Sequence, residues 1–173
     1  MKLLTLNTHS LQETHYEEKL EQFIEEIVKT QPDIIAMQEV NQSISAPSAG
    51  PELLSGFFPC PQESITVRED NHAAQTAKRL RAHGLNYSWT WISAKIGYGK
   101  YDEGMALFCN PKPITSAESF FISGCKDYDN WKTRKVLGIQ TDVCKDWFYT
   151  VHMGWWQDTE EPFASQWERL ETH

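Results

Sequence analysis

Two polar residues with the chemistry of a phosphate or metal site each follow an apolar run. Asn7 comes after residues 2–6, and Glu39 comes after residues 34–37. A carboxylate is a hard oxygen ligand suited to Mg²⁺ or Mn²⁺, and an amide hydrogen-bonds phosphate without adding charge. If the two runs are neighbouring parallel strands, their carboxyl ends meet at the sheet edge where ligands bind. From spacing alone, a turn beginning at Asn7 and a strand end capped by Glu39 explain the pattern equally well.

A histidine and two tryptophans follow the last apolar segment of the chain. His152 ends residues 147–152, and Trp155 and Trp156 follow in a turn that begins with glycine. An imidazole titrates near neutral pH, so it can hydrogen-bond a phosphate oxygen or act as an acid. Taken alone, a hydrogen-bonded structural histidine explains His152 better. At least one of the tryptophans is expected near the mouth of any site there, where a flat ring offers a surface for a sugar or base.

The elements that would position these residues alternate between strand and helix. Residues 2–6 and 33–40 predict buried strands, and residues 16–29 carry apolar residues at helical spacing under an acidic face. Strand, helix and strand in this order favour a right-handed parallel crossover. The chain therefore opens as an α/β protein.

The remaining segments extend this pattern. Residues 41–61, rich in Ser, Pro and Gly, predict a long loop near the rim of the site. Further elements are a helix at 71–83, strands at 87–92, 104–108, 135–142 and 147–152, and a helix beginning near Glu161. Residues 165–173 predict an uncapped helix with nothing after it to bury its apolar side. The chain is therefore expected to be cut off inside a domain.

Composition limits the classes of function. The 173 residues are 40% hydrophobic and 12% aromatic, enough for one domain with a sizeable core. A net charge of −8 argues against wrapping long nucleic acid, although a divalent cation and one arginine can still bind a phosphate. Apolar runs stay far below the roughly 20 residues that span a bilayer, so no membrane is expected and the cytoplasm is the expected location. Four scattered cysteines predict reduced thiols.

Two motifs resemble the opening of a known superfamily. LTLNTHS at residues 4–10 and PDIIAMQEV at residues 32–40 look like the first two motifs of the endonuclease/exonuclease/phosphatase superfamily, which includes DNase I. The resemblance implies an active-site amide at Asn7 and a metal-binding carboxylate at Glu39. It favours the functional interpretation of both residues.

The resemblance continues along the chain. YDEGMALF at residues 101–108 is similar to a superfamily strand on which Glu103 would pair with His152. In such a pair the carboxylate fixes the imidazole tautomer and stabilises the imidazolium. Arg134, in WKTRKVLGIQTD, matches the superfamily arginine that contacts substrate phosphate, a task suited to a planar and always charged guanidinium.

The later superfamily motifs do not occur. Neither G-D-x-N nor an Asp-His pair is found in the sequence. Residues 1–173 are therefore expected to form a single, C-terminally incomplete domain, the N-terminal part of a four-layer α/β/β/α sandwich. Since the missing Asp and His would activate the attacking water, the 173-residue chain alone is expected to be inactive.

The expected activity is metal-dependent hydrolysis of a phosphoester by water, with Mg²⁺ or alternatively Mn²⁺ as cofactor. LNTHS, QEVNQ, YDEG and VHMGWW look closest to a bacterial branch that includes the maltose 6′-phosphate phosphatases. That likeness implies a small sugar phosphate as substrate, with Trp155 and Trp156 stacking on the sugar. The alternatives are a nuclease or phosphodiesterase, and a catalytically inactive binding fragment.

Overall fold

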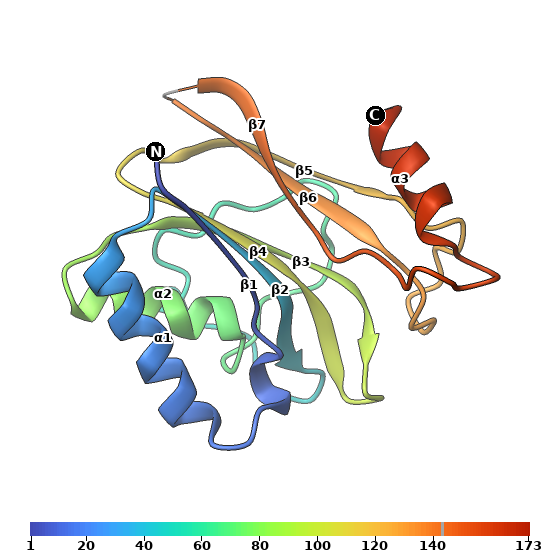
Figure 1. Ribbon diagram of the computed structural model, residues 1–173. Helices are drawn as coiled ribbons and strands as arrows, with labels where there is room; N and C mark the ends of the chain where they lie inside the picture. Colours follow the sequence, from blue (N-terminus) through green and yellow to red (C-terminus); the bar gives the residue numbers. More distant parts are fainter. Residues whose placement is uncertain (143) are drawn as a thin grey trace.

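The computed structural model describes residues 1–142 and 144–173. Two β-sheets face each other, and α1 (Tyr16–Thr30) and α2 (His72–Ala82) cover the outer face of the first sheet (Figure 1). This sheet has the strand order β1-β2-β4-β3. Its strands are β1 (Leu3–Asn7), β2 (Ile34–Ser43), β3 (Ser88–Gly97) and β4 (Tyr101–Cys109). β1 runs parallel to β2, as the strand–helix–strand pattern predicts, and the other pairs are antiparallel.

The second sheet is antiparallel in the described residues, with the order β5-β6-β7. Its strands are β5 (Ile114–Phe121), β6 (Lys135–Thr141) and β7 (Cys144–Val151). A short 3-10 turn, η1 (Ser10–Gln12), follows β1, and α3 (Phe163–Glu171) lies beside the far end of the second sheet (Figure 1). The expected α/β class, with two sheets and outer helices, is confirmed.

Two apolar layers hold these elements together, because side chains of each strand alternate between its two faces. Between helices and first sheet lie residues such as Leu20, Ile24, Met37, Leu80, Trp89 and Trp91. Between the two sheets lie Ile34, Ala36, Ile92, Met105, Leu137 and Ile139. β2, β3 and β4 are therefore buried on both faces, which fixes the register of these strands. β1 is largely exposed, with Leu3 56% and Leu6 41% exposed, so the expectation of a buried strand at residues 2–6 is wrong.

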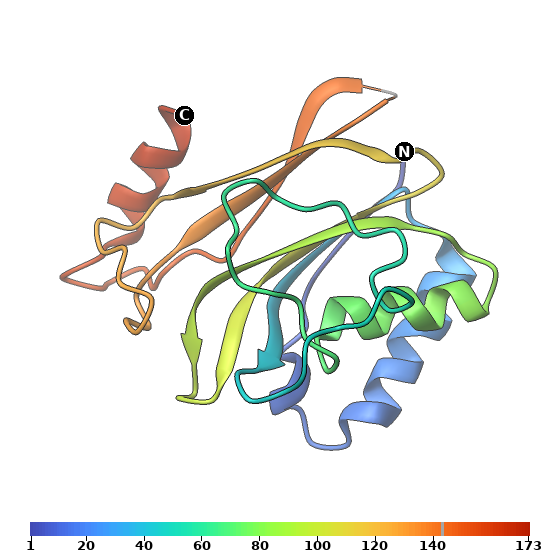
Figure 2. The ribbon, with the colours of Figure 1, turned by 180° about the vertical axis from the view of Figure 1, so that it is seen from behind.

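Several expectations need correction. Residues 41–43, expected in the long loop, continue β2. The loop that follows runs past the β3 edge toward β5 (Figure 2), with Phe57 bridged to Trp89 and Gln62 accepting from the Ser119 amide. β5 is a strand that the sequence pattern did not indicate. β3 and β4 are longer than expected, so Glu103 lies inside β4 rather than before it.

The cysteines and the lengths of the helices bear on two expectations drawn from the composition. Cys60, Cys109 and Cys125 are free thiols, while the side chain of Cys144 lies outside the described residues. Within residues 1–142 and 144–173, no helix is both long and apolar enough to cross a membrane.

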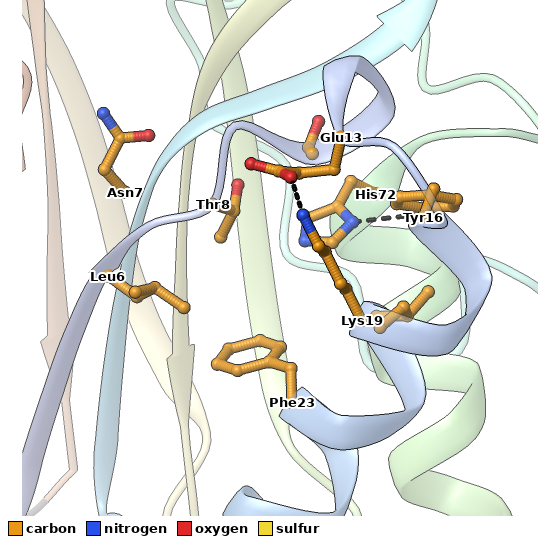
Figure 3. A pocket seen from close by; sticks show the side chains of 10 residues that line it. Leu6, Asn7, Thr8, Glu13, Tyr16, Lys19, Phe23 and His72 are labelled. Carbon is orange, nitrogen blue, oxygen red and sulfur yellow. Dashed lines mark hydrogen bonds and ion pairs between the residues drawn. The ribbon is translucent and has the colours of Figure 1, made fainter.

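A buried histidine joins the two helices beneath the first sheet. His72, 4% exposed, places Nδ1 2.9 Å from the hydroxyl of Tyr16 beside a hollow of about 230 Å³ (Figure 3). Its Nε2 has no hydrogen-bond partner among the described residues. Burial lowers the pKa of His72 from 6.5 to about 3. The imidazole is therefore neutral in the native protein at physiological pH.

This burial predicts acid sensitivity. Because the native pKa of His72 is depressed, the unfolded chain binds a proton between about pH 6.5 and 3 that the native protein does not, so stability falls as pH falls through that window. Relative to wild type, His72→Gln should retain on the order of 2 kcal/mol more of its pH 7 stability at about pH 4.5. Urea unfolding at both pH values measures the difference. The exposed His83→Gln serves as control, and equal acid losses in all three proteins would contradict the assignment.

Candidate active site

The end of β1 and a bulge within β2 bring Asn7 and Glu39 together, so Glu39 does not end its strand as the sequence suggested. Asn7 Nδ2 donates to Glu39 Oε1 at 2.9 Å, and Asn7 Oδ1 accepts from the backbone amide of His9 at 3.1 Å. In Figure 3 the side chain of Asn7 points away from those of Tyr16 and His72. The amide of Asn7 is thus oriented at both ends, and it fixes one oxygen of the carboxylate.

A β-bulge turns Glu39 into this position. The register of β2 against β4 shifts between Gln38 and Val40, and Glu39 between them has φ 53°. A left-handed backbone is uncommon for a residue with a side chain and persists where surrounding structure enforces it. Bulges re-aim a side chain out of the regular strand alternation. The carboxylate that results is 16% exposed, with Oε1 3.6 Å from Nε2 of His152.

A second bulge, between Ser93 and Lys95, shapes the floor of the site. The register sets Lys95 opposite Glu103, and Glu103 opposite Asn41, so the three side chains share one face of the sheet. Lys95 Nζ lies 3.0 Å from Glu103 Oε1 and donates to the carbonyl of Trp131 at 3.1 Å. Both charged side chains are about nine-tenths buried.

The structure corrects the expected partners of Glu103 and His152. Glu103 pairs with Lys95, while His152 approaches Glu39. The reason is topological, because the β3–β4 hairpin sets Lys95 directly across from Glu103. Burial lowers the pKa of His152, opposed by Glu39, and the cations Arg134 and Lys95 lower it further. These effects favour the neutral imidazole near pH 7.

Arg134 lies directly before β6 and is 6% exposed. Its Nη1 donates to the carbonyls of Trp131, at 2.6 Å, and Thr133, at 3.0 Å. Its Nε has no hydrogen-bond partner within the described part of the chain. Burial lowers the pKa of Arg134, but a guanidinium starts so high that it stays charged. The edge formed by Nε and Nη2 is the one suited to a bidentate oxyanion.

The charged side chains and His152 border one cleft of about 340 Å³, whereas Asn7 lines the hollow near His72. The polar lining of the cleft comprises Glu39, Lys95, Glu103, Arg134 and His152, and its aromatic lining comprises Tyr98, Trp131 and Trp155. Of the tryptophan pair expected at the mouth, Trp155 lines the cleft, whereas the ring of Trp156 packs against Phe163 at 5.7 Å. Tyr98 is joined to His9, whose Nε2 lies 3.1 Å from the tyrosine hydroxyl.

The donor atoms of the cleft fit a hard divalent cation whose coordination is completed by water and substrate oxygens. Among the described residues, no three His, Cys, Asp or Glu side chains gather into a metal-binding group. Mg²⁺, however, commonly uses one or two carboxylates together with water and substrate phosphate oxygens. Glu39 suits this role, since its contacts with Asn7 and His152 are both made by Oε1, which leaves Oε2 for a metal.

Two facing sheets with outer helices and a polar cleft at the strand ends define a DNase I-like fold. The chain belongs to the endonuclease/exonuclease/phosphatase family, whose model matches residues 4–171. No curated protein matches the chain.

Solved structures share the architecture. A family protein from Leptotrichia buccalis C-1013-b is 26% identical, with a TM-score of 0.85, and the match covers 100% of this chain and 61% of that one. An endonuclease/exonuclease/phosphatase from Beutenbergia cavernae DSM 12333 is 14% identical, with a TM-score of 0.60 over 99% of this chain and 41% of that one. The human nocturnin catalytic domain, solved with bound sulfate, is 16% identical, with a TM-score of 0.52 over 98% of this chain and 52% of that one. This chain thus spans about three fifths of the first relative.

Among the charged and aromatic residues of the cleft, sequence reasoning missed Lys95, Tyr98 and Trp131. A signal existed for Lys95, because the tight Gly-Tyr-Gly-Lys turn at residues 97–100 predicts a hairpin whose register sets Lys95 against Glu103. No sequence signal indicated Trp131, since it lies in a loop and reaches the cleft through tertiary contacts.

The Lys95–Glu103 pair should be energetically coupled. Lys95→Met and Glu103→Gln should each cost about 2 to 4 kcal/mol of unfolding free energy, because each strands a buried partner. The double variant should lose about 1 to 3 kcal/mol less than the sum of the two. Denaturant unfolding of the four proteins provides the cycle. The exposed Glu26–Lys29 pair is the control and should couple by less than about 0.5 kcal/mol; additivity at the buried pair would refute the coupling.

Proposed function

We propose that the protein is a metal-dependent phosphoester hydrolase in which water attacks phosphorus. The observation that carries the proposal is the opposition of charges across one cleft. Arg134 and Lys95 supply two buried cations, and Glu39, held by Asn7, supplies a carboxylate for a metal. A phosphoryl group needs such preorganised donors around the charge that develops in its transition state.

Each side chain has a task in this proposal. Arg134 presents Nε and Nη2 to two phosphoryl oxygens, and Lys95 adds a point charge beside it. Asn7 keeps the Glu39 carboxylate in place, and neutral His152 hydrogen-bonds a phosphoryl oxygen through its ring nitrogen. Glu103 positions Lys95 and offsets its charge. Mg²⁺ or Mn²⁺ bound at Glu39 would neutralise charge on the phosphoryl group.

A small sugar phosphate is the proposed substrate. The net charge of −8 disfavours long nucleic acid, and the cleft mouth carries tryptophan rather than a basic groove. The likeness to the maltose 6′-phosphate phosphatase branch rests on sequence motifs and supports the same class. A cytoplasmic location is proposed from the four scattered cysteines, whose spacing is typical of reduced thiols.

Glu39→Gln tests the metal assignment. In the full-length protein it should lower Mg²⁺-dependent hydrolysis roughly a hundredfold or more, because it removes ligand charge while changing little volume. Hydrolysis is measured across a Mg²⁺ titration, and the melting temperature checks the fold. Glu26→Gln, on the exposed face of α1, is the matched control. Activity within a few-fold of wild type would exclude Glu39 as the metal ligand.

The substrate class is tested by comparing the rates of two reactions in the full-length protein. The full-length protein should release phosphate from a disaccharide phosphate at least about a hundredfold faster than it nicks plasmid DNA, since an acidic surface repels the duplex. Both rates are measured in the same buffer at physiological salt. Efficient nicking would favour the nuclease, and inactivity in both assays would favour the binding fragment.

A further inference from the structure

Two tryptophans from different segments meet at the mouth of the cleft. Trp131 precedes β6 and Trp155 follows β7, yet their ring centroids are 5.4 Å apart with a tilt of 59°. Trp131 is 48% and Trp155 71% exposed. Rings this close leave no space between them, so they form one continuous, angled aromatic surface. Exposed apolar surface bordered by polar groups at a cleft is typical of a binding site.

Trp131 also touches the charged interior of the cleft. Its backbone carbonyl accepts hydrogen bonds from Lys95 Nζ at 3.1 Å and from Arg134 Nη1 at 2.6 Å. The same residue therefore carries an aromatic wall on its side chain and holds both cations through its backbone. The distance between the cations and the aromatic surface is set by one short segment.

Trp155 is held by contacts that do not involve the cleft. Gly154, the residue before it, donates its backbone amide to Gln166 of α3 at 2.7 Å. Lys132 Nζ binds Asp158 and Glu160, each at 2.9 Å. The loop of Trp155 is thus fastened both to α3 and to the residue following Trp131. A surface fastened in this way is preorganised, so a ligand loses little by binding to it.

The neighbouring Trp156 provides an internal contrast. It is 77% exposed, but its ring packs toward Phe163, and it is absent from the lining of the cleft. Adjacent tryptophans therefore have different environments, and Trp131 takes the place that the sequence suggested for Trp156.

We infer that Trp131 and Trp155 form a preformed subsite for the apolar face of a pyranose ring, with Lys132 as the positioning residue. The inference rests on the proposed function for the placement of the phosphate at Arg134 and Lys95. An angled surface contacts a puckered ring on two sides, whereas a flat base stacks on only one of the two rings. The Glu160 carboxylate, 75% exposed, adds negative charge that repels a polynucleotide backbone. The buried Asp158 carboxylate is already bound by Lys132 and by the backbone amides of Glu160 and Glu161.

Kinetics with two phosphomonoesters test the subsite in the full-length protein. Trp131→Ala and Trp155→Ala should each raise KM for glucose 6-phosphate about tenfold with kcat unchanged, and leave KM for ethyl phosphate within about twofold. Trp156→Ala is the matched control and should change neither value. A similar KM rise for both substrates, or a Trp131→Ala variant that behaves like Trp156→Ala, would overturn the inference.

Lys132 tests the positioning role. Lys132→Met should raise KM for glucose 6-phosphate about threefold without lowering kcat, and Lys132→Arg should restore it, since arginine keeps the ion pairs. Failure of that rescue, with the melting temperature unchanged, would remove Lys132 from the inference.

Binding without turnover separates the subsite from the proposed reaction. Calorimetry with glucose 6-phosphate in EDTA should show affinity about tenfold weaker in both tryptophan variants than in wild type. If wild type hydrolyses no phosphomonoester but this difference is seen, the subsite stands and the proposed hydrolase fails. If wild type hydrolyses ethyl phosphate but all variants bind glucose 6-phosphate equally, the hydrolase stands and the subsite fails.

Discussion

One backbone oxygen, the carbonyl of Trp131, accepts hydrogen bonds from both buried cations of the cleft. Two like charges repel, and each loses hydration when it is buried. Lys95 and Arg134 can therefore stay side by side only with compensation from a carbonyl dipole and from the Glu103 carboxylate. This arrangement depends on the second sheet, because Trp131 and Arg134 precede β6 whereas Lys95 and Glu103 belong to the first sheet.

The irregular backbone of the first sheet also helps to place the charged side chains of the cleft. Regular alternation would send successive residues of β2 to opposite faces, so the bulge at Glu39 is what brings its carboxylate to the strand ends beside Asn7. Gly97 makes a related contribution on β3, because a Cβ there would lie 2.5 Å from Glu103 Oε2. The sheet is regular where it packs and irregular where it carries charge.

The contrast between regular and irregular strand segments explains which features could be predicted from the sequence. The apolar runs before Asn7 and Glu39 indicate a parallel strand pair, of which only β2 is buried on both faces, and the shared strand direction then brings the two residues together. Bulges leave no comparable pattern. The turn at residues 97–100 indicates the pairing of Lys95 with Glu103, but the bulge that separates this register from that of the preceding residues of β3 is not indicated by the sequence. The place of Trp131 and Trp155 at the cleft depends on tertiary contacts, of Lys132 with Asp158 and of Gly154 with Gln166, which the sequence pattern does not indicate.

The charges of the cleft favour joint binding of the proposed metal and the substrate phosphate. Glu39 and Glu103 balance Lys95 and Arg134, and the environment of His152 favours its neutral form, so the cleft has little net charge. A phosphate dianion entering alone would leave an excess of negative charge at low dielectric, which costs free energy. A divalent cation entering alone would leave the opposite excess. Binding the two together keeps the cleft near neutrality, and this mutual compensation supports metal dependence from the residues of this chain.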